Sequence, residues 1–310
     1  LTYDRPYPLG DAYIENDPYA PRPGNRYFLS GTLAALDAPG EWFLDRKAGQ
    51  LYLYAPDGKS PDTHRVEVRK RPFSFVLDNQ SDVLVSGFES FGAAISMIGS
   101  VRCTADRIDM RYHEHFTEVD GYAATWAYRL NRMTGRDNVF RNSRIAFSAG
   151  DGIRVGGVGN RVENCLLRDL NYAGAWLAPI MTEPEAGASV GAVISRCTIR
   201  NAGRNSILFQ LAEQLTIEYC DVSKASLLVK DCGLISAWGT DGKGSVIRYN
   251  WAHDNVGKWT CGIYLDNYCR NFTIHHNVVW NVSDAAIRIN SPGEDIGVYN
   301  NTILNGSQAF

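Results

Sequence analysis

The chain has 310 residues and a formal net charge of −3, with 45% hydrophobic and 21% charged residues. This balance provides no basic surface for nucleic acid or for an anionic membrane, and no apolar run is long enough to span a bilayer. The sequence starts at Leu1 without an initiator methionine and ends at Phe310 inside a repeating unit. We therefore expect both ends to continue in a longer protein.

The first 80 residues differ from the rest. Proline-rich turns come first, followed by two aromatic runs at 42–44 and 51–54, which are joined by a turn over 45–49. Short aromatic runs on either side of a glycine-containing turn are typical of a β-hairpin. We interpret 1–80 as a β-rich cap or insert, and 81–310 as a second unit whose regular structure begins near Val83.

A repeated position dominates the second unit. An asparagine or cysteine recurs every 23 to 32 residues, at Asn142, Cys165, Cys197, Cys220, Asn250, Asn277 and Asn301. An aliphatic residue lies three positions before each, at Val139, Val162, Ile194, Ile217, Ile247, Ile274 and Val298. A polar turn position lies four residues after most of them, at Asp169, Asn201, Lys224, Asp254, Asn281 and Asn305. This period indicates a solenoid in which asparagines stack between neighbouring coils and the cysteines are buried, reduced thiols.

A second set of segments has the alternation of short strands. They are 152–155, 174–177, 206–209, 233–236, 262–265 and 286–289. The leucine-dense consensus of leucine-rich repeats and the 3.6-residue period of helical repeats are both absent. The sequence therefore predicts an all-β fold, a right-handed parallel β-helix of the pectate-lyase-like type.

The outward positions of these strands suggest a ligand surface. Alternation predicts that two columns face outward, the first with Arg154, Trp176, Leu208, Ile235, Tyr264 and Arg288, the second with Gly156, Ala178, Gln210, Ala237, Asp266 and Asn290. Insertions at 111–134, 178–188 and 237–244 add loops, the last of which contains Trp238. Aromatic rings beside arginines and amides suit a sugar. We expect Tyr264, Trp176 and Trp238 to stack on it, and Arg154, Arg288 and Gln210 to bind its hydroxyl or carboxylate groups.

Carboxylates provide the candidate chemistry. Glycosidases use two carboxyl groups, one as acid and the other as base or nucleophile. Asp266 is the only carboxylate in its predicted column, so its partner must come from elsewhere. Asp231 at the start of the preceding strand and Asp241 in the loop after that strand are both candidates.

The region from Lys230 to Asn281 carries a family resemblance. Its segments 230–233 (KDCG), 238–242 (WGTDG), 262–267 (GIYLDN) and 274–281 (IHHNVVWN) resemble those of β-helix carbohydrate-active enzymes. The nearest resemblance is to the glycoside hydrolases with α-fucosidase/xylanase and β-xylosidase-like members, whose β-rich insert is similar to 40–54. The resemblance implies a carbohydrate substrate and polysaccharide degradation. We expect no cofactor and a secreted or periplasmic location.

Two other functions stay open. A polysaccharide lyase would use Lys230 or Arg288 as base, with Asp231, Asp241 and Asp266 holding a Ca²⁺ that neutralises a uronic acid. A third possibility is a carbohydrate-binding β-helix without catalytic activity. The shared scaffold does not separate these functions.

Overall fold

The computed structural model describes residues 31–116, 130–182, 189–255 and 257–304. The chain divides into two compact units, residues 1–70 and 71–310. In the first unit, strands β1 (Trp42–Asp45) and β2 (Gln50–Leu53) form the expected antiparallel hairpin. Two short 3₁₀ helices, η2 (Leu33–Ala35) and η3 (Pro61–Thr63), lie before and after it.

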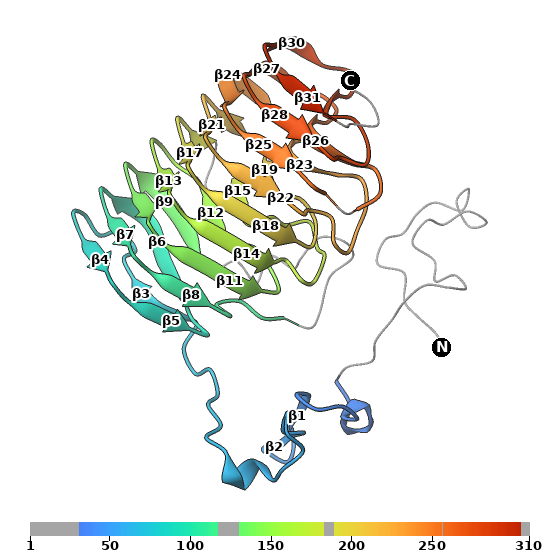
Figure 1. Ribbon diagram of the computed structural model, residues 1–310. Coiled ribbons are helices and arrows are strands. Elements are labelled where there is room, and N and C mark those ends of the chain that lie inside the picture. Colours follow the sequence, from blue (N-terminus) through green and yellow to red (C-terminus); the bar gives the residue numbers. More distant parts are fainter. Residues whose placement is uncertain (1–30, 117–129, 183–188, 256, 305–310) are drawn as a thin grey trace, which may run out of the picture. The chain divides into compact units, whose positions relative to one another are not determined.

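The second unit is a parallel β-helix. Within the described ranges it has three nine-stranded parallel sheets, and each coil contributes one strand to each sheet (Figure 1). Sheet 1 consists of β3 (Phe73–Val76), β6 (Ala94–Val101), β9 (Arg132–Arg136), β12 (Ile153–Val155), β15 (Ile180–Thr182), β19 (Ile207–Phe209), β23 (Cys232–Ala237), β26 (Thr260–Leu265) and β29 (Ile287–Ile289). Sheet 2 consists of β4 (Leu84–Ser86), β7 (Thr104–Asp106), β10 (Val139–Arg141), β13 (Arg161–Glu163), β17 (Val193–Ser195), β21 (Thr216–Glu218), β24 (Asp241–Arg248), β27 (Arg270–His275) and β30 (Glu294–Tyr299). Sheet 3 consists of β5 (Glu89–Phe91), β8 (Asp109–Arg111), β11 (Arg144–Ser148), β14 (Leu166–Leu170), β18 (Thr198–Ala202), β22 (Asp221–Ser223), β25 (Trp251–His253), β28 (Val278–Trp280) and β31 (Thr302–Leu304). A further short pair joins β16 (Ser189–Val190) to β20 (Ala212–Glu213).

The predicted right-handed parallel β-helix is therefore confirmed, but its first coil starts earlier than expected. Strand β3 pairs in parallel with β6, so the coils begin at Phe73 rather than near Val83. The unit boundary correspondingly lies after Lys70 instead of after residue 80. In the described part of the chain, no helix is long and apolar enough to cross a membrane.

The core lies between the three sheets. One residue of each short strand points inward and stacks on its counterpart in the next coil, which removes apolar surface from water. In sheet 2 this column contains Phe140, Val162, Ile194, Ile217, Ile247 and Ile274, each at most 1% exposed. Phe140 pairs with Val162, so it takes the place that the sequence pattern assigned to Val139.

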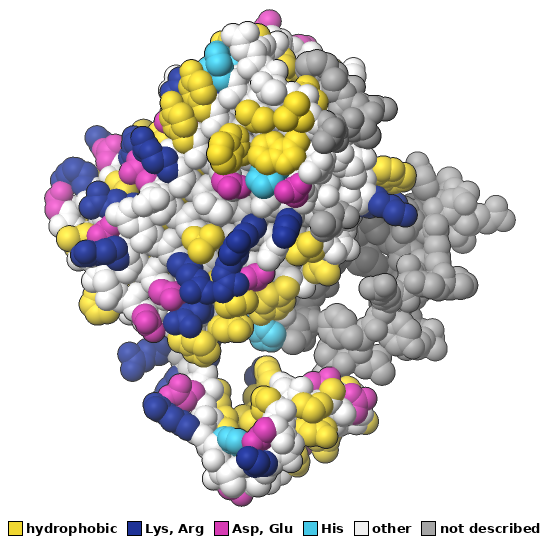
Figure 2. Space-filling view, viewed as in Figure 1, with side chains coloured by type: hydrophobic (Ala, Val, Ile, Leu, Met, Phe, Trp, Pro, Cys, Tyr) yellow, Lys and Arg dark blue, Asp and Glu magenta, His cyan; other side chains and the backbone are white. Residues whose placement is uncertain are grey.

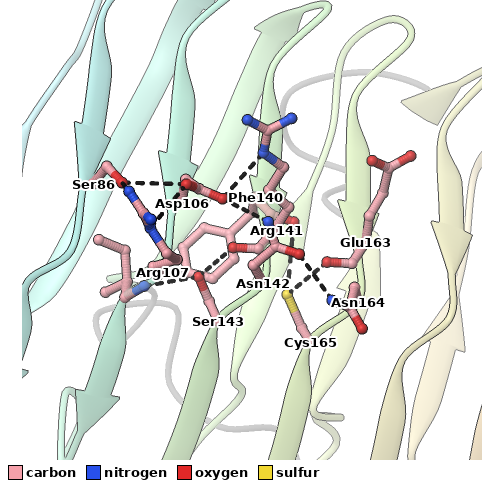
Figure 3. Close-up of polar contacts among 11 residues, drawn as sticks. Ser86, Asp106, Arg107, Phe140, Arg141, Asn142, Ser143, Glu163, Asn164 and Cys165 are labelled. Atoms are coloured by element: carbon pink, nitrogen blue, oxygen red, sulfur yellow. Dashed lines mark hydrogen bonds and ion pairs between the residues drawn. The ribbon is translucent and has the colours of Figure 1, made fainter.

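The asparagine and cysteine column is confirmed from Cys165 to Asn301 and is wrong at Asn142. Because Phe140 is the inward residue, Ser143 is the residue that aligns with Cys165. Its hydroxyl accepts a hydrogen bond from the Ile108 N–H at 3.0 Å. Asn142 instead lies one position before the column, in line with Asn164 of the next coil, and its Oδ1 accepts a hydrogen bond from Asn164 Nδ2 (Figure 3).

The asparagines link successive coils as predicted. Asn277 Oδ1 accepts hydrogen bonds from both the backbone N–H and Nδ2 of Asn250, each at 3.0 Å. Asn301 Oδ1 accepts the equivalent pair from Asn277, at 3.0 and 2.9 Å. Each amide therefore satisfies buried polar groups where the chain turns from sheet 2 to sheet 3.

The second polar turn column is confirmed within the residues that the structure describes. Its members Asp169, Asn201, Lys224, Asp254 and Asn281 have positive φ, between 50° and 59°. Asparagine and aspartate tolerate this left-handed conformation better than most residues do. Asn305 lies outside the described residues.

Candidate active site

A small pocket opens on the outer face of sheet 1, where the coils of β23 and β26 are neighbours. It is lined by Trp176, Asn205, Leu208, Asp231, Ser236, Ala237, Trp238, Tyr264 and Asp266. Its volume is about 30 Å³, enough for one or two water molecules.

The register of sheet 1 determines which side chains reach this face. Ile235 pairs with Ile263 and points into the core, so its predicted outward position is wrong. Ser236 is the outward residue, and it lies beside Tyr264. The error arises because Gly233 pairs with Cys261, one residue before the glycine with which the sequence pattern aligned it.

Asp266, directly after β26, is held in place by two hydrogen-bond donors. Its Oδ1 accepts hydrogen bonds from Asn290 Nδ2 at 2.7 Å and from the Asn267 N–H at 2.8 Å. Asn290 is its neighbour in the next coil, as predicted. In the preceding coil the neighbour is Trp238 rather than Ala237, because Ala237 pairs with Leu265.

Tyr264 lies between two carboxylates. Its hydroxyl is 3.5 Å from Asp231 Oδ1 and accepts a hydrogen bond from Asn290 Nδ2 at 2.9 Å. Burial is the main cause that raises the pKa of Tyr264 well above its usual range, and the negative charges of Asp231 and Asp266 raise it further. The phenol therefore stays protonated and can act as a hydrogen-bond donor at any physiological pH.

Asp231 and Asp266 lie close to each other. The contacts that run from Asp231 through Tyr264 and Asn290 to Asp266 measure 3.5, 2.9 and 2.7 Å, so the two Oδ1 atoms are at most about 9 Å apart. This limit lies within the roughly 5–9.5 Å over which glycosidase carboxyl pairs operate.

Two tryptophans border the pocket, as the sequence suggested, but Trp176 comes from a connecting segment rather than from a strand. Trp176 does not belong to a sheet 1 strand. The strand of that coil is β15, and Met181 takes the outward position between Arg154 and Leu208. Trp176 instead belongs to the segment between β14 and β15, and the Arg204 guanidinium lies 4.5 Å from the centre of its ring. Trp238, directly after β23, is 46% exposed.

The predicted polar binders lie outside the pocket lining. Arg288 follows Tyr264 in its column, but its Nη2 forms an ion pair with Asp284 Oδ1 at 3.0 Å. Gln210 lies one coil before Trp238, and its backbone N–H donates to the Thr182 hydroxyl.

Arg154 has the predicted register but not the predicted exposure. It lies in the outward column of sheet 1, yet it is only 1% exposed and forms an ion pair with Asp151. The imidazole of His113 is also buried there and lies 2.9 Å from the Asp151 carbonyl oxygen. Arg154 is therefore part of a buried polar cluster, which argues against direct sugar binding.

Asp241 is not brought to the pocket. It begins β24 on sheet 2, where Arg270 Nε and Asn271 Nδ2 bind its two carboxylate oxygens at 3.0 and 2.7 Å. The hydrogen bond from Asn271 is the main cause that holds its pKa below the usual range. Asp241 is thus held by contacts on sheet 2, outside the pocket lining.

The carboxylates predicted to hold a calcium ion are not brought together. With Asp241 held on sheet 2, Asp231, Asp241 and Asp266 do not form one cluster. No group of three or more histidine, cysteine or acidic side chains in the described ranges could hold a metal ion. Lys230, the candidate lyase base, places its Nζ 4.4 Å from the ring centre of Trp259.

Sequence reasoning missed two pocket residues. Asn205 is 3% exposed, and its Oδ1 accepts hydrogen bonds from the Gly233 N–H and the Ser236 hydroxyl, both at 3.0 Å. This amide fixes the start and the outward side chain of β23. Ser236 was missed because of the register error, and Asn205 because it precedes the strand in which alternation can be recognised.

Comparisons with known proteins find similar solved structures and one matching family. Among solved structures it is similar to the A-modules of two Azotobacter vinelandii mannuronan C-5 epimerases. For AlgE6 the identity is 13% and the TM-score 0.36, with 76% of each chain covered. For AlgE4 the identity is 12% and the TM-score 0.34, with 76% of this chain and 78% of the other covered. It is also similar to the GH136 lacto-N-biosidase from Eubacterium ramulus, at 13% identity and a TM-score of 0.32, over 74% of this chain and 51% of that one.

A comparison with curated protein sequences finds no match. The family described as "Right handed beta helix region" matches residues 132–303, more than half of the chain. This range contains every coil that contributes to the pocket. The chain belongs to the right-handed β-helix family.

Proposed function

We propose that this protein is a glycoside hydrolase whose carboxyl pair is Asp231 and Asp266. One observation carries the proposal: in a pocket bordered by two tryptophans, the Tyr264 hydroxyl contacts Asp231 directly and is linked to Asp266 through the Asn290 amide. Indole rings provide flat apolar faces for sugar C–H groups. A carboxyl pair at this separation provides the acid and the base that cleavage of a glycosidic bond requires.

The environments of the two carboxylates suggest their roles. Asp266 is oriented by Asn290 and by the Asn267 N–H, so we assign it as nucleophile or general base. Asp231 is more exposed and would protonate the leaving oxygen as the C–O bond breaks. Tyr264 keeps its proton and would donate a hydrogen bond to a sugar oxygen or to the nearby carboxylates.

The test is turnover on a panel of neutral and acidic oligosaccharides and polysaccharides, measured by release of reducing ends. Asp231→Asn and Asp266→Asn should each reduce turnover by a factor of about 10²–10⁴, while folding is retained. Asp241→Asn is the matched control, because it removes a charge from a neighbouring strand that does not line the pocket. It should retain turnover.

Three results would overturn the proposal. The first is near-normal turnover in either pocket variant. The second is a product with the ultraviolet absorbance of an unsaturated uronic acid, which would identify a lyase. The third is binding of a sugar without any cleavage, which would leave a carbohydrate-binding protein.

A further inference from the structure

A second cluster of aromatic and polar side chains lies on the outer face of sheet 3. It consists of outward residues of β22, β25 and β28 together with the residue that follows β25. We name it the sheet 3 patch: Asp221, Trp251, His253, Asp254 and Trp280. Figure 2 shows hydrophobic, acidic and histidine side chains gathered on this face of the molecule, which Figure 1 displays from the same side.

The patch is held in one arrangement. The rings of His253 and Trp280 are stacked, with centroids 4.1 Å apart and an interplanar angle of 4°. The two ring nitrogens of His253 lie 2.9 Å from Asp221 Oδ1 and 2.9 Å from Asp254 Oδ2. Asn281 Nδ2 donates to the other oxygen of Asp254 at 2.8 Å. Trp251 meets Trp280 edge-on at 6.4 Å and remains 55% exposed.

These contacts prepare the patch for a ligand with hydroxyl groups and flat apolar faces. Both carboxylate side chains are 43% exposed, so they can accept further hydrogen bonds at fixed positions. Trp251 offers an indole surface beside them. The patch carries two carboxylates beside one imidazole, which suits hydroxyl donors and disfavours a polyanion. A neutral polysaccharide has this chemistry.

The patch also lies next to the pocket along the chain. Strand β25 is followed along the chain by β26, so Trp251 and His253 precede Tyr264 and Asp266 across the single corner from sheet 3 to sheet 1. Asp221 and Asp231 have the same relation at the preceding corner, between β22 and β23. Trp259, 61% exposed, lies between β25 and β26 in the sequence, directly before β26. A polymer bound at the pocket could therefore continue over the corner to sheet 3.

We infer that the sheet 3 patch binds a neutral polysaccharide chain at a site distinct from the pocket. The inference rests on the proposed function only in the choice of a carbohydrate as the ligand. Its role would be to hold the polymer while the pocket acts on one of its bonds.

The experiment is affinity gel electrophoresis with xylan, mannan and a soluble cellulose derivative, and with polygalacturonate as the anionic comparison. It is performed with Asp266→Asn, so that substrate is not consumed. This protein should be retarded by at least one neutral polymer, and adding Trp251→Ala should weaken the apparent affinity about tenfold. Phe91→Ala is the control, because Phe91 is a 69% exposed aromatic residue at the far end of the same sheet.

Several results would overturn the inference. They are no retardation by any neutral polymer, unchanged affinity in Trp251→Ala, or an equal loss in Phe91→Ala. A dimer that disappears in Trp251→Ala, detected by sedimentation, would identify the patch as a protein interface instead.

The outcome separates this inference from the proposed hydrolase. Binding that depends on Trp251 in a protein that cleaves no sugar supports the patch and refutes the hydrolase. Cleavage together with polymer binding that is unchanged in Trp251→Ala supports the hydrolase and refutes the patch. If both hold, Trp251→Ala should raise KM for the polymer about tenfold and leave cleavage of a short oligosaccharide unchanged.

Discussion

Asn277→Leu tests the physical role of the asparagine column. Asn277 is 1% exposed, and its side chain forms hydrogen bonds with both neighbouring coils. Its Oδ1 accepts the backbone N–H of Asn250, and its Nδ2 donates to the Ile247 carbonyl at 2.9 Å. Leucine has the same number of side-chain heavy atoms and the same branching at Cγ but neither accepts nor donates, so the substitution removes hydrogen bonds without opening a cavity.

The magnitude follows from the groups that are left behind. The Asn250 N–H and the Ile247 carbonyl each lose a partner in a buried turn. Each buried orphan costs about 1–3 kcal/mol, so the free energy of unfolding should fall by about 2–6 kcal/mol. For a unit of this size the melting temperature should drop on the order of 10 °C.

Denaturant and thermal unfolding followed by circular dichroism would measure this effect. Thr302→Leu is the control, because Thr302 is an exposed polar residue one coil further on, and its replacement should change stability by less than about 1 kcal/mol. Unchanged stability in Asn277→Leu, or loss of activity in a protein of normal stability, would refute the structural role of the column.

Three further predictions concern residues near the site and in the core. Asp241→Asn should lower stability slightly, by weakening its contacts on sheet 2, and should leave KM and kcat unchanged in a steady-state assay. Cys165, Cys197 and Cys220 should react slowly with a thiol reagent in the native protein and rapidly after denaturation, because each is at most 2% exposed; rapid native labelling would contradict their burial. Because the pKa of Tyr264 is raised on folding, the native state keeps a proton that the unfolded chain loses near pH 10, so wild-type stability should fall relative to Tyr264→Phe as the pH rises above about 10. Parallel pH dependence of the two melting temperatures would contradict this.

The sequence was most informative where one physical constraint repeats. A buried turn in every coil requires a satisfied polar group or a small residue, so Asn250, Asn277 and Asn301 could be recognised without the structure. The pattern failed at Asn142 because an aromatic residue, Phe140, occupies the inward place next to the aliphatic Val139. Hydrophobicity alone does not decide which of two adjacent apolar residues points inward.

The site was harder to predict because its parts lie between repeats. Asp231, Tyr264 and Asp266 were found as candidates since two of them belong to or follow a regular strand. Trp176 and Asn205 come from connecting segments, whose paths do not follow the period. Arg154 shows a further limit: register is visible in the sequence, but burial also depends on what lies over the strand.

A crystal structure of the Asp266→Asn variant with a bound oligosaccharide tests the assignment of the carboxyl pair most directly. We expect a glycosidic oxygen between Asp231 and residue 266, a sugar oxygen within hydrogen-bond distance of the Tyr264 hydroxyl, and a sugar ring against Trp176 or Trp238. An oligosaccharide that leaves this pocket empty and binds on another face would contradict the assignment of Asp231 and Asp266 as the carboxyl pair.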